Sequence, residues 1–401
     1  MSESVGPRRG HVVFVQFGDY GATVKRFAEG GDEAYYAQRY SVDFVARLTD
    51  RYERVTVITA VVDHPEELLP NGVYARGVKL YGRNRGNGFK LLIEALEALR
   101  AERLIVMAPL YPVLLWAARR GINTLPMLFD SFRARGLRAR LRCWLLARLL
   151  RSSRFPWVSN HGMSAASELI RIGVPAEKVI PMDWPAFDSP VGRGEKSLSA
   201  KSSFKVIFVG QISIAKGALD LILAIDRLNR DWPGCEYRVT LVGSEVGDNL
   251  GALARKTSFA DRISFAGPVS HSEIVTLMSE HDAVIVPSRH DYPEGMPMTI
   301  YESYCSRSPL IASDHPMFEY KLRDRYNCLR FKASSVGSLA DAIRTLSQDV
   351  DLYAQLSRNT LDAASRHFHP LKYHQVLESW LEQPSGANAF LASNSVASLS
   401  A

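Results

Sequence analysis

The stretch that decides the fold is residues 283–302, AVIVPSRHDYPEGMPMTIYE. Its first four residues form a short apolar run, rich in β-branched side chains, that stops at Pro287. Such a run is typical of a buried parallel strand. Pro297 suits the first turn of a helix that continues to about Cys305. Because ligands of open α/β sheets bind at the carboxyl ends of strands, the stretch predicts a ligand site between this strand and this helix.

Two carboxylates lie in this stretch, Glu294 in the predicted loop and Glu302 inside the predicted helix. A helix start presents unpaired N–H groups and a positive dipole end, which suit a diphosphate. Carboxylates accept hydrogen bonds from sugar and ribose hydroxyls, and Gly295 lets a ligand approach the backbone closely. The pair therefore indicates a nucleotide-sugar site. The local spacing alone leaves open that both are ordinary surface glutamates.

A second informative segment, residues 208–217, reads FVGQISIAKG. It predicts a strand end, a turn at Gly210 and a helix that opens at Lys216-Gly217. A lysine at a strand end beside a helix start can neutralise a diphosphate leaving group, although a solvated surface lysine would give the same pattern. The glycines of 243–247 lack the dinucleotide-binding spacing and no Walker A motif occurs, which argues against a dehydrogenase or a P-loop ATPase.

Apolar runs alternate with helical patterns along both halves of the chain, which favours parallel sheets covered by helices on both faces. At 401 residues the chain exceeds one comfortable core, so we expect two domains. The predicted architecture is α/β, with two Rossmann-like doubly wound domains facing across a cleft. The expected boundaries are an N-terminal domain at 1–187, a linker at 188–203, a C-terminal domain at 204–382 and a disordered, Ser/Ala-rich tail at 383–401.

Individual elements follow from the same patterns. In the first half we expect strands at 12–17, 55–59, 104–107, 157–159 and 178–180, with helices at 32–48, 89–99 and 164–172. In the second half we expect strands at 205–209, 237–242, 263–265, 283–286 and 310–312, with helices at 217–228, 271–279 and 336–346.

Composition places the chain among globular proteins, with 46% hydrophobic and 23% charged residues. The four cysteines are scattered without a CxxC pair, which indicates reduced thiols and neither a disulfide framework nor a zinc site. The polar residues 1–10 lead into only a short apolar run, so we expect a first strand there and not a secretory segment or a membrane span. A cytoplasmic protein is the expectation.

The most polarised segment of the chain is basic. No acidic residue occurs between Ser131 and Ser167, and apolar residues recur there at helical spacing, so we expect an amphipathic basic helix at 133–154. Such a helix can lie on anionic lipid headgroups, or it can pack on its own domain with its arginines in solvent. Nucleic acid is disfavoured because no binding motif accompanies the charge. The arginines are Arg133, Arg135, Arg138, Arg140, Arg142, Arg148, Arg151 and Arg154.

Taken in order, the motifs of the second half resemble those of the retaining, GT-B-fold glycosyltransferases of family 4 (glycosyl transferases group 1). The resemblance extends from about Val12 to about Phe368 and is strongest from Lys205 to Pro316. The ordered motifs are Gly210 with Lys216-Gly217, residues 241–243, 265–267, 287–288, Glu294 with Glu302, and 309–314.

The resemblance implies an enzyme that moves a sugar from a nucleotide-diphosphate sugar to a hydroxyl, with retention of anomeric configuration and no metal or other cofactor. It places Lys216 and Gly217 at the donor phosphates beside Gly210 and Gln211. Glu294 is then expected at the transferred sugar, with the backbone of Gly295 and Met296 on the donor, and Glu302 at the ribose. In the first half it assigns Gly30-Gly31 to a loop near donor and acceptor, and His161 to the last unit of that domain, where a structural role is favoured.

Two positions depart from the family pattern. Gln211 replaces the usual arginine, which removes one positive charge from the phosphate site. Phe129 replaces the usual histidine of a His-Asp pair, so Asp130 is left to hold acceptor or donor sugar and no general base can be assigned. The roles expected to be catalytic therefore fall on Lys216, Glu294 and Asp130.

Three functions stay open on this basis. The first is a glycosyltransferase of cell-surface polysaccharide or glycolipid synthesis, with a glycan or lipid-linked acceptor, working at the inner face of a membrane. The second is a non-catalytic subunit that binds sugar nucleotides or glycans, suggested by Gln211 and Phe129. The third is a nucleotide-sugar epimerase of the same fold.

Overall fold

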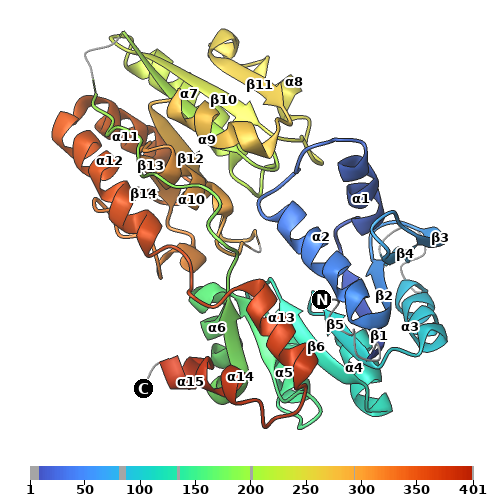
Figure 1. Cartoon of the computed structure of the whole chain (residues 1–401). Helices are drawn as coiled ribbons and strands as arrows, with labels where there is room; N and C mark the ends of the chain where they lie inside the picture. The colour runs from blue at the N-terminus through green and yellow to red at the C-terminus, as the bar shows by residue number, and fades with distance from the viewer. Residues whose placement is uncertain (1–8, 81–86, 133–135, 199–201, 293, 400–401) are drawn as a thin grey trace. The chain divides into compact units, whose positions relative to one another are not determined.

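The structure is a computed structural model that describes residues 9–80, 87–132, 136–198, 202–292 and 294–399. The chain forms two compact units, unit 1 from Met1–Pro185 with His369–Ala401, and unit 2 from Ala186–Phe368 (Figure 1). Each unit contains its own mainly parallel sheet with helices packed on it, which confirms the predicted α/β class with two Rossmann-like domains. No helix of the described ranges has the length and apolar character that crossing a bilayer requires.

Unit 1 is built on an eight-stranded sheet in the order β3-β4-β2-β1-β5-β6-β7-β8, in which only the β3–β4 pair is antiparallel. Chain order reverses between β1 and β5, which are neighbours in the sheet, so this is the topological switch point of unit 1. The strands are β1 (Arg9–Gln16), β2 (Tyr52–Thr59), β3 (His64–Leu68), β4 (Tyr74–Gly77), β5 (Arg103–Val106), β6 (Asn123–Leu128), β7 (Val158–His161) and β8 (Val179–Met182). The helices are α1 (Tyr20–Ala28), α2 (Gln38–Arg47), α3 (Gly88–Leu99), α4 (Tyr111–Arg120), α5 (Leu137–Leu150), α6 (Gly162–Arg171), α13 (Tyr373–Glu382), α14 (Ala389–Ser393) and α15 (Val396–Leu399).

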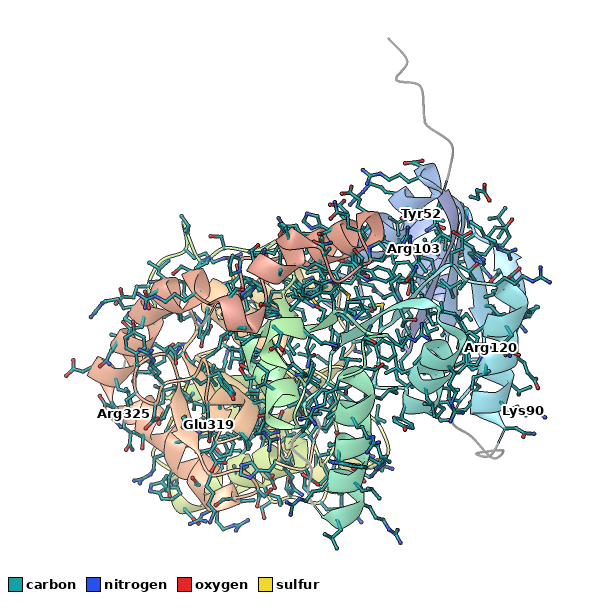
Figure 2. The ribbon with its side chains drawn as sticks, turned by 90° about the horizontal axis from the view of Figure 1, so that it is seen from below. Tyr52, Lys90, Arg103, Arg120, Glu319 and Arg325 are labelled. Carbon is teal, nitrogen blue, oxygen red and sulfur yellow. The ribbon has the colours of Figure 1, made fainter. Side chains whose placement is uncertain are left out.

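The two faces of this sheet belong to different cores because successive residues of a strand point to opposite sides. Val13 and Val15 of β1 pack in one core with residues of α3 to α6, while Val12 and Phe14 pack in the other with residues of α2 and α13. The outer sides of α3 and α4 are charged. Figure 2 shows Lys90 and Arg120 on these outer sides, where they pair with Glu94 and Glu97.

Unit 2 is built on a fully parallel sheet in the order β11-β10-β9-β12-β13-β14. Its switch point lies between β9 and β12, which pair with Val206 opposite Ala283. The strands are β9 (Ser203–Val209), β10 (Glu236–Val242), β11 (Ile263–Gly267), β12 (Ala283–Val286), β13 (Leu310–Ser313) and β14 (Leu329–Phe331). The helices are α7 (Ala218–Asp231), α8 (Leu250–Ala254), α9 (His271–Ser279), α10 (Met298–Cys305), α11 (Val336–Gln348) and α12 (Val350–Ser365).

The expected domain boundary at residue 382 is wrong, because the chain returns to unit 1 at His369. Asp183 N donates to Leu371 O and Tyr373 N donates to Asp183 O, so the returning segment is bonded beside the end of β8. Val376, Leu377 and Trp380 of α13 are then buried in the core of unit 1. Figure 1 shows the red α13 to α15 within unit 1.

The prediction of a disordered tail at 383–401 is also wrong for its described part, which forms α14 and α15. Asn388 caps α14 by accepting from Leu391 N, and both Leu391 and Val396 are buried in the cores of unit 1. The Ser/Ala-rich composition concealed these two anchors. Their burial supplies the hydrophobic stabilisation that composition did not indicate.

The segment predicted as a linker, 188–203, packs on unit 2 where it is described. Tyr301 OH donates to Asp188 O at 2.5 Å, and Lys196 Nζ donates to Ser308 Oγ at 2.8 Å. Near the N-terminus of unit 1, one predicted helix starts later than expected and one helix was not predicted. The helix expected at 32–48 begins at Gln38, because residues before it form turns, and α1 was not predicted.

Helix α5 confirms the predicted basic helix between Leu137 and Leu150, whereas Arg151 and Arg154 follow the helix in a turn and Arg133 and Arg135 lie outside the described residues. It packs on unit 1 through Leu146, Ala147 and Leu150. A second apolar stripe points away from that core, with Leu137, Leu141 and Trp144 exposed by 83%, 57% and 53%. The helix therefore has two apolar faces, where the sequence predicted one.

Candidate active site

The strongest candidate site lies at the switch point of unit 2. Lys216 lies in the segment that follows β9, and Glu294 in the segment that follows β12. Because β9 and β12 are adjacent and parallel, their carboxyl ends meet at one edge of the sheet. Residues separated by 78 positions in sequence thus come into direct contact.

Lys216 and Glu294 form a buried ion pair. The ammonium Nζ lies 2.8 Å from each carboxylate oxygen, Glu294 is 3% exposed, and the ammonium also lies 4.5 Å from the centre of the Tyr292 ring. Burial raises the pKa of Glu294, and the neighbouring Lys216 opposes that rise. The attraction between the two opposite charges offsets part of the cost of burying them.

Two glycines allow the loops to approach so closely. A Cβ on Gly217, whose φ is +79°, would lie 2.0 Å from Pro287 O, and one on Gly243 would lie 2.0 Å from Gly210 O. Both distances are far inside van der Waals contact, so only glycine fits at these positions. The start of α7 is thereby held against the end of β12, next to the Lys216–Glu294 pair.

Glu302 lies inside α10, the helix that follows Glu294 in the chain, and is 4% exposed. Its Oε1 is 2.8 Å from Nε2 of His271, the first residue of α9. The imidazole therefore fixes the orientation of this carboxylate, and α10 begins at Met298 shortly after Gly295 and Met296. The first N–H groups of α10 and two oriented carboxylates thus share one edge of the sheet, an arrangement suited to a ligand that carries both phosphates and hydroxyls.

A second ion pair supports this edge. Arg289 donates from Nε and Nη2 to the two carboxylate oxygens of Asp220, at 2.8 and 2.6 Å, and so joins the segment after β12 to α7. A two-pronged contact of this kind fixes orientation as well as distance. It ties the segment between β12 and α10 to the first turn of α7.

Of the predicted residues of unit 1, Asp130 lies at the equivalent edge of its sheet. Asp130 follows β6 and lines a pocket of about 370 Å³, together with residues that follow β1 and β5 at the switch point. Burial raises the pKa of the Asp130 carboxyl, and no hydrogen-bonding partner of this carboxylate occurs among the described residues. Gly30 and Gly31 do not line this pocket. They end α1, where Gly31 N donates to Arg26 O.

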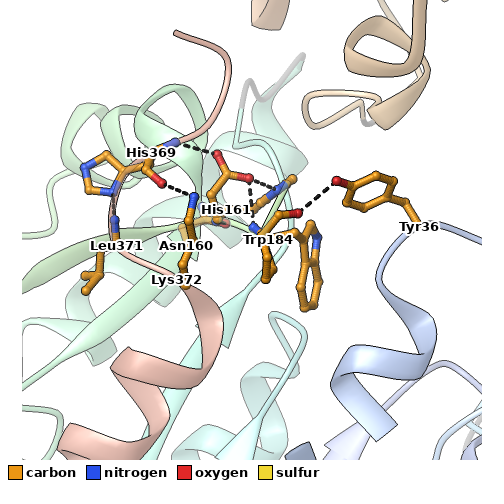
Figure 3. A network of polar contacts seen from close by, with 9 residues as sticks. Tyr36, Asn160, His161, Trp184, His369, Leu371 and Lys372 are labelled. Atoms are coloured by element: carbon orange, nitrogen blue, oxygen red, sulfur yellow. Dashed lines mark hydrogen bonds and ion pairs between the residues drawn. The ribbon is translucent and has the colours of Figure 1, made fainter. Parts of the chain in front are cut away.

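His161, for which the sequence favoured a structural role, contacts a buried carboxylate. Its Nε2 lies 2.9 Å from Asp183 Oδ1, and Asp183 also accepts from the backbone N–H groups of Trp184 and His369 (Figure 3). Phe129 stacks on Trp184 at 5.6 Å between ring centres with 12° between planes. Phe129, where the resemblance led us to expect a histidine, is therefore part of an aromatic wall.

Some functional candidates gave no sequence signal. His271 is 31 positions from Glu302, and Trp184 and Tyr373 lie far from Asp130 in sequence. Strand order and helix packing, which are tertiary features, bring each of these groups together. Gln211, by contrast, is an exposed residue of the segment after β9. No group of three or more His, Cys, Asp and Glu suited to a metal occurs in the described ranges.

Most of unit 2 matches a known protein family. Residues 194–362 match the family model described as glycosyl transferases group 1. The chain is 27% identical over 154 residues to an alpha-D-kanosaminyltransferase of Streptomyces kanamyceticus, covering 38% of this chain and 39% of that protein. It is 24% identical over 238 residues to a D-inositol 3-phosphate glycosyltransferase of Paenarthrobacter aurescens, covering 57% and 55%. The chain thus spans well under two thirds of the length of these curated relatives.

Solved structures resemble the whole chain. The sucrose-phosphate synthase of Thermosynechococcus elongatus aligns with a TM-score of 0.67 at 16% identity, covering 94% of this chain and 98% of that one. Anabaena HepE in complex with UDP-glucose aligns with a TM-score of 0.65 at 15% identity, covering 93% and 99%. Residues 194–362 thus match the glycosyl transferases group 1 family, and the chain has the two-domain GT-B fold.

Proposed function

We propose that this protein is a retaining glycosyltransferase that moves a sugar from a nucleotide-diphosphate sugar to a hydroxyl acceptor. The observation that carries the proposal is the buried Lys216–Glu294 pair at the switch point of unit 2, with Glu302 oriented by His271 on the same edge. The family match of residues 194–362 supports it, as does the UDP-glucose bound by the structural neighbour HepE.

In the proposed reaction, the ammonium of Lys216 stabilises the charge that develops on the departing diphosphate. The backbone of Gly210, Gln211 and Gly217 lies beside the phosphates, and that of Gly295 and Met296 lies along the donor. Glu294 accepts hydrogen bonds from hydroxyls of the transferred sugar, and Glu302 accepts them from the ribose. The leaving diphosphate takes the acceptor proton on the same face of the sugar, so the anomeric configuration is retained. The protein contributes positioning and electrostatic stabilisation, and the donor is a substrate with no further cofactor.

The direct test is a panel of nucleotide sugars. One donor is expected to raise the melting temperature by binding the folded state, with UDP sugars as the first to examine. With a hydroxyl acceptor, that donor should release nucleoside diphosphate, and NMR of the first product should show the donor's anomeric configuration. An inverted product would contradict retention. Binding without turnover across a broad acceptor panel would instead support a sugar-nucleotide-binding subunit, and donor conversion without acceptor an epimerase.

We further propose that the enzyme works in cell-surface polysaccharide or glycolipid synthesis at the inner face of a membrane, resting on α5. The exposed stripe of Leu137, Leu141 and Trp144 is flanked by the exposed arginines Arg138 and Arg140. Apolar side chains that enter the headgroup region and arginines that meet anionic lipid are the two contributions of an interfacial helix. Because Leu146, Ala147 and Leu150 already anchor α5 to unit 1, the exposed stripe is free to contact lipid.

Vesicle binding tests this surface. The protein should sediment with phosphatidylglycerol-containing vesicles, less so as salt rises, and little with phosphatidylcholine alone. Leu141→Asn combined with Trp144→Ser should weaken binding about tenfold or more, because two inserting side chains are lost. Leu361→Asn, at an exposed apolar position on α12, is the matched control. Equal sedimentation of the double variant and this control would rule out the stripe as the lipid contact.

A further inference from the structure

The pocket of unit 1 has a chemistry that the donor site does not explain. Its walls come from residues that follow four parallel strands, β1, β5, β6 and β8, and from α1, α2 and the first residue of α13. A pocket of about 370 Å³ is in the range of small-molecule sites and is large enough for a single sugar or cyclitol ring. We call it the aromatic pocket. Its described lining residues are Gln16, Phe17, Gly18, Tyr20, Thr23, Tyr35, Ser41, Val42, Val45, Met107, Ala108, Phe129, Asp130, Trp184 and Tyr373.

Six aromatic rings line the aromatic pocket. Trp184 stands between Phe129 and Tyr373, with ring centres 5.6 and 4.9 Å away, and forms a continuous wall with them. Tyr373 is buried, and so is Tyr20, another of the six aromatic residues. Aromatic faces carry a negative quadrupole that attracts cations, and cages of such rings are a recurrent way to hold an ammonium group.

The ionisable groups of the aromatic pocket also favour a ligand with an ammonium group. Asp130 carries the one carboxyl group among the described lining residues, and no lysine, arginine or histidine occurs among them. Burial raises the pKa of the phenols of Tyr20 and Tyr373 further above neutrality, so both stay uncharged. His161, behind Phe129 and Trp184, is engaged by Asp183. An anionic ligand would therefore meet a carboxylate and no cation, whereas an ammonium would meet a carboxylate and several ring faces.

We propose that the aromatic pocket binds an acceptor ring that carries a protonated amino group, an amino sugar or an aminocyclitol, with its ammonium beside Asp130. This inference rests on the proposed function, because it names the acceptor class of the same enzyme. The ring hydroxyls face the polar groups of Gln16, Thr23 and Ser41, which line the same space. A phosphorylated acceptor is disfavoured, because the described lining offers no cation and burying an unpaired phosphate beside a carboxylate is strongly unfavourable.

The test compares four ligands of one ring size by calorimetry with the full chain: scyllo-inositol, scyllo-inosamine, N-acetyl-scyllo-inosamine and D-inositol 3-phosphate. The inosamine is expected to bind about tenfold tighter than the inositol or the N-acetylated ring, because a charge-assisted hydrogen bond and cation–π contacts exist only for the ammonium. Inositol 3-phosphate is expected to bind weakest. Equal binding of amine and neutral rings, or tighter binding of the phosphate, would overturn the assignment.

Two variants locate the effect. Asp130→Asn should abolish the preference for the amine, and Tyr35→Ala, at a half-exposed ring, should reduce it several-fold without disturbing the core. Asp50→Asn removes an exposed carboxylate of unit 1 and serves as the charge-matched control. If Asp130→Asn keeps the wild-type preference, the ammonium does not bind there.

Failure of this inference differs from failure of the proposed function. Stabilisation by a nucleotide sugar and release of nucleoside diphosphate, with no amine preference in the aromatic pocket, would leave the glycosyltransferase in place and refute only its acceptor class. An amine preference without any response to nucleotide sugars would refute the glycosyltransferase and leave an amine-binding pocket.

Discussion

Lys216→Met is expected to lower the rate of sugar transfer by about a hundredfold or more, because the donor's diphosphate departs without its cationic partner. Gln211 carries no charge, so Lys216 is the one cation within residues 210–217, the segment that follows β9. The measurement is kcat/KM for nucleoside diphosphate release with the donor identified in the panel. Lys256→Met, which removes an exposed lysine of unit 2, is the control.

The same variant should also lose stability, by about 3–5 kcal/mol at neutral pH, because Glu294 is left as an uncompensated buried charge. Burial already raises the pKa of Glu294, and removing Lys216 raises it further. A carboxyl whose folded-state pKa lies above its unfolded value stabilises the fold at low pH, and this contribution is lost as pH rises through the folded-state pKa. The difference in melting temperature between wild type and Lys216→Met should therefore shrink as pH is lowered from 8 to 5.

A double variant separates the structural effect from the catalytic one. Lys216→Met with Glu294→Gln replaces the ion pair by neutral groups and should regain most of the lost stability. Its transfer activity should stay as low as that of Lys216→Met. Recovery of activity together with stability would show that Lys216 only supports the fold.

Glu302→Ala is expected to raise the KM for the donor by roughly 10- to 100-fold, since a hydrogen bond to a charged group contributes about 1.5–3 kcal/mol. The carboxylate is buried and already oriented by His271, so no rearrangement is needed before it accepts from ribose hydroxyls. A 2′,3′-dideoxy analogue of the donor nucleotide should bind wild type more weakly than the parent nucleotide does. In Glu302→Ala the two should bind alike.

Glu273→Ala, at an exposed position of α9 close in sequence to His271, is the matched control and should leave donor binding unchanged. His271→Ala should weaken donor binding less than Glu302→Ala does, because the carboxylate of Glu302 remains but is less well oriented. If Glu302→Ala discriminates against the dideoxy analogue as wild type does, the ribose hydroxyls contact another group.

Local sequence patterns predicted much of unit 2. The run Ala283–Val286 is strand β12 with the predicted bounds, and His271–Ser279 is α9, because short β-branched runs and clear helical periodicity leave few alternatives. The sequence also predicted the close turns at the loop glycines, and Gly217 does lie where only glycine fits. Unit 1 was harder to predict. Its C-terminal helices lie far along the chain, and Leu391 and Val396 are isolated anchors in a polar context.

The site divides in the same way. By itself the sequence singled out the candidate residues of the proposed donor site, Lys216, Glu294 and Glu302, because strand ends and helix starts are local signals. Only the tertiary structure decided their partners. Strand order places β9 beside β12 and so pairs Lys216 with Glu294, and packing of α9 on α10 gives Glu302 its histidine. The tertiary structure likewise places the aromatic rings beside Asp130. Contacts between residues distant in sequence depend on the order of strands in the sheet, which no local pattern specifies.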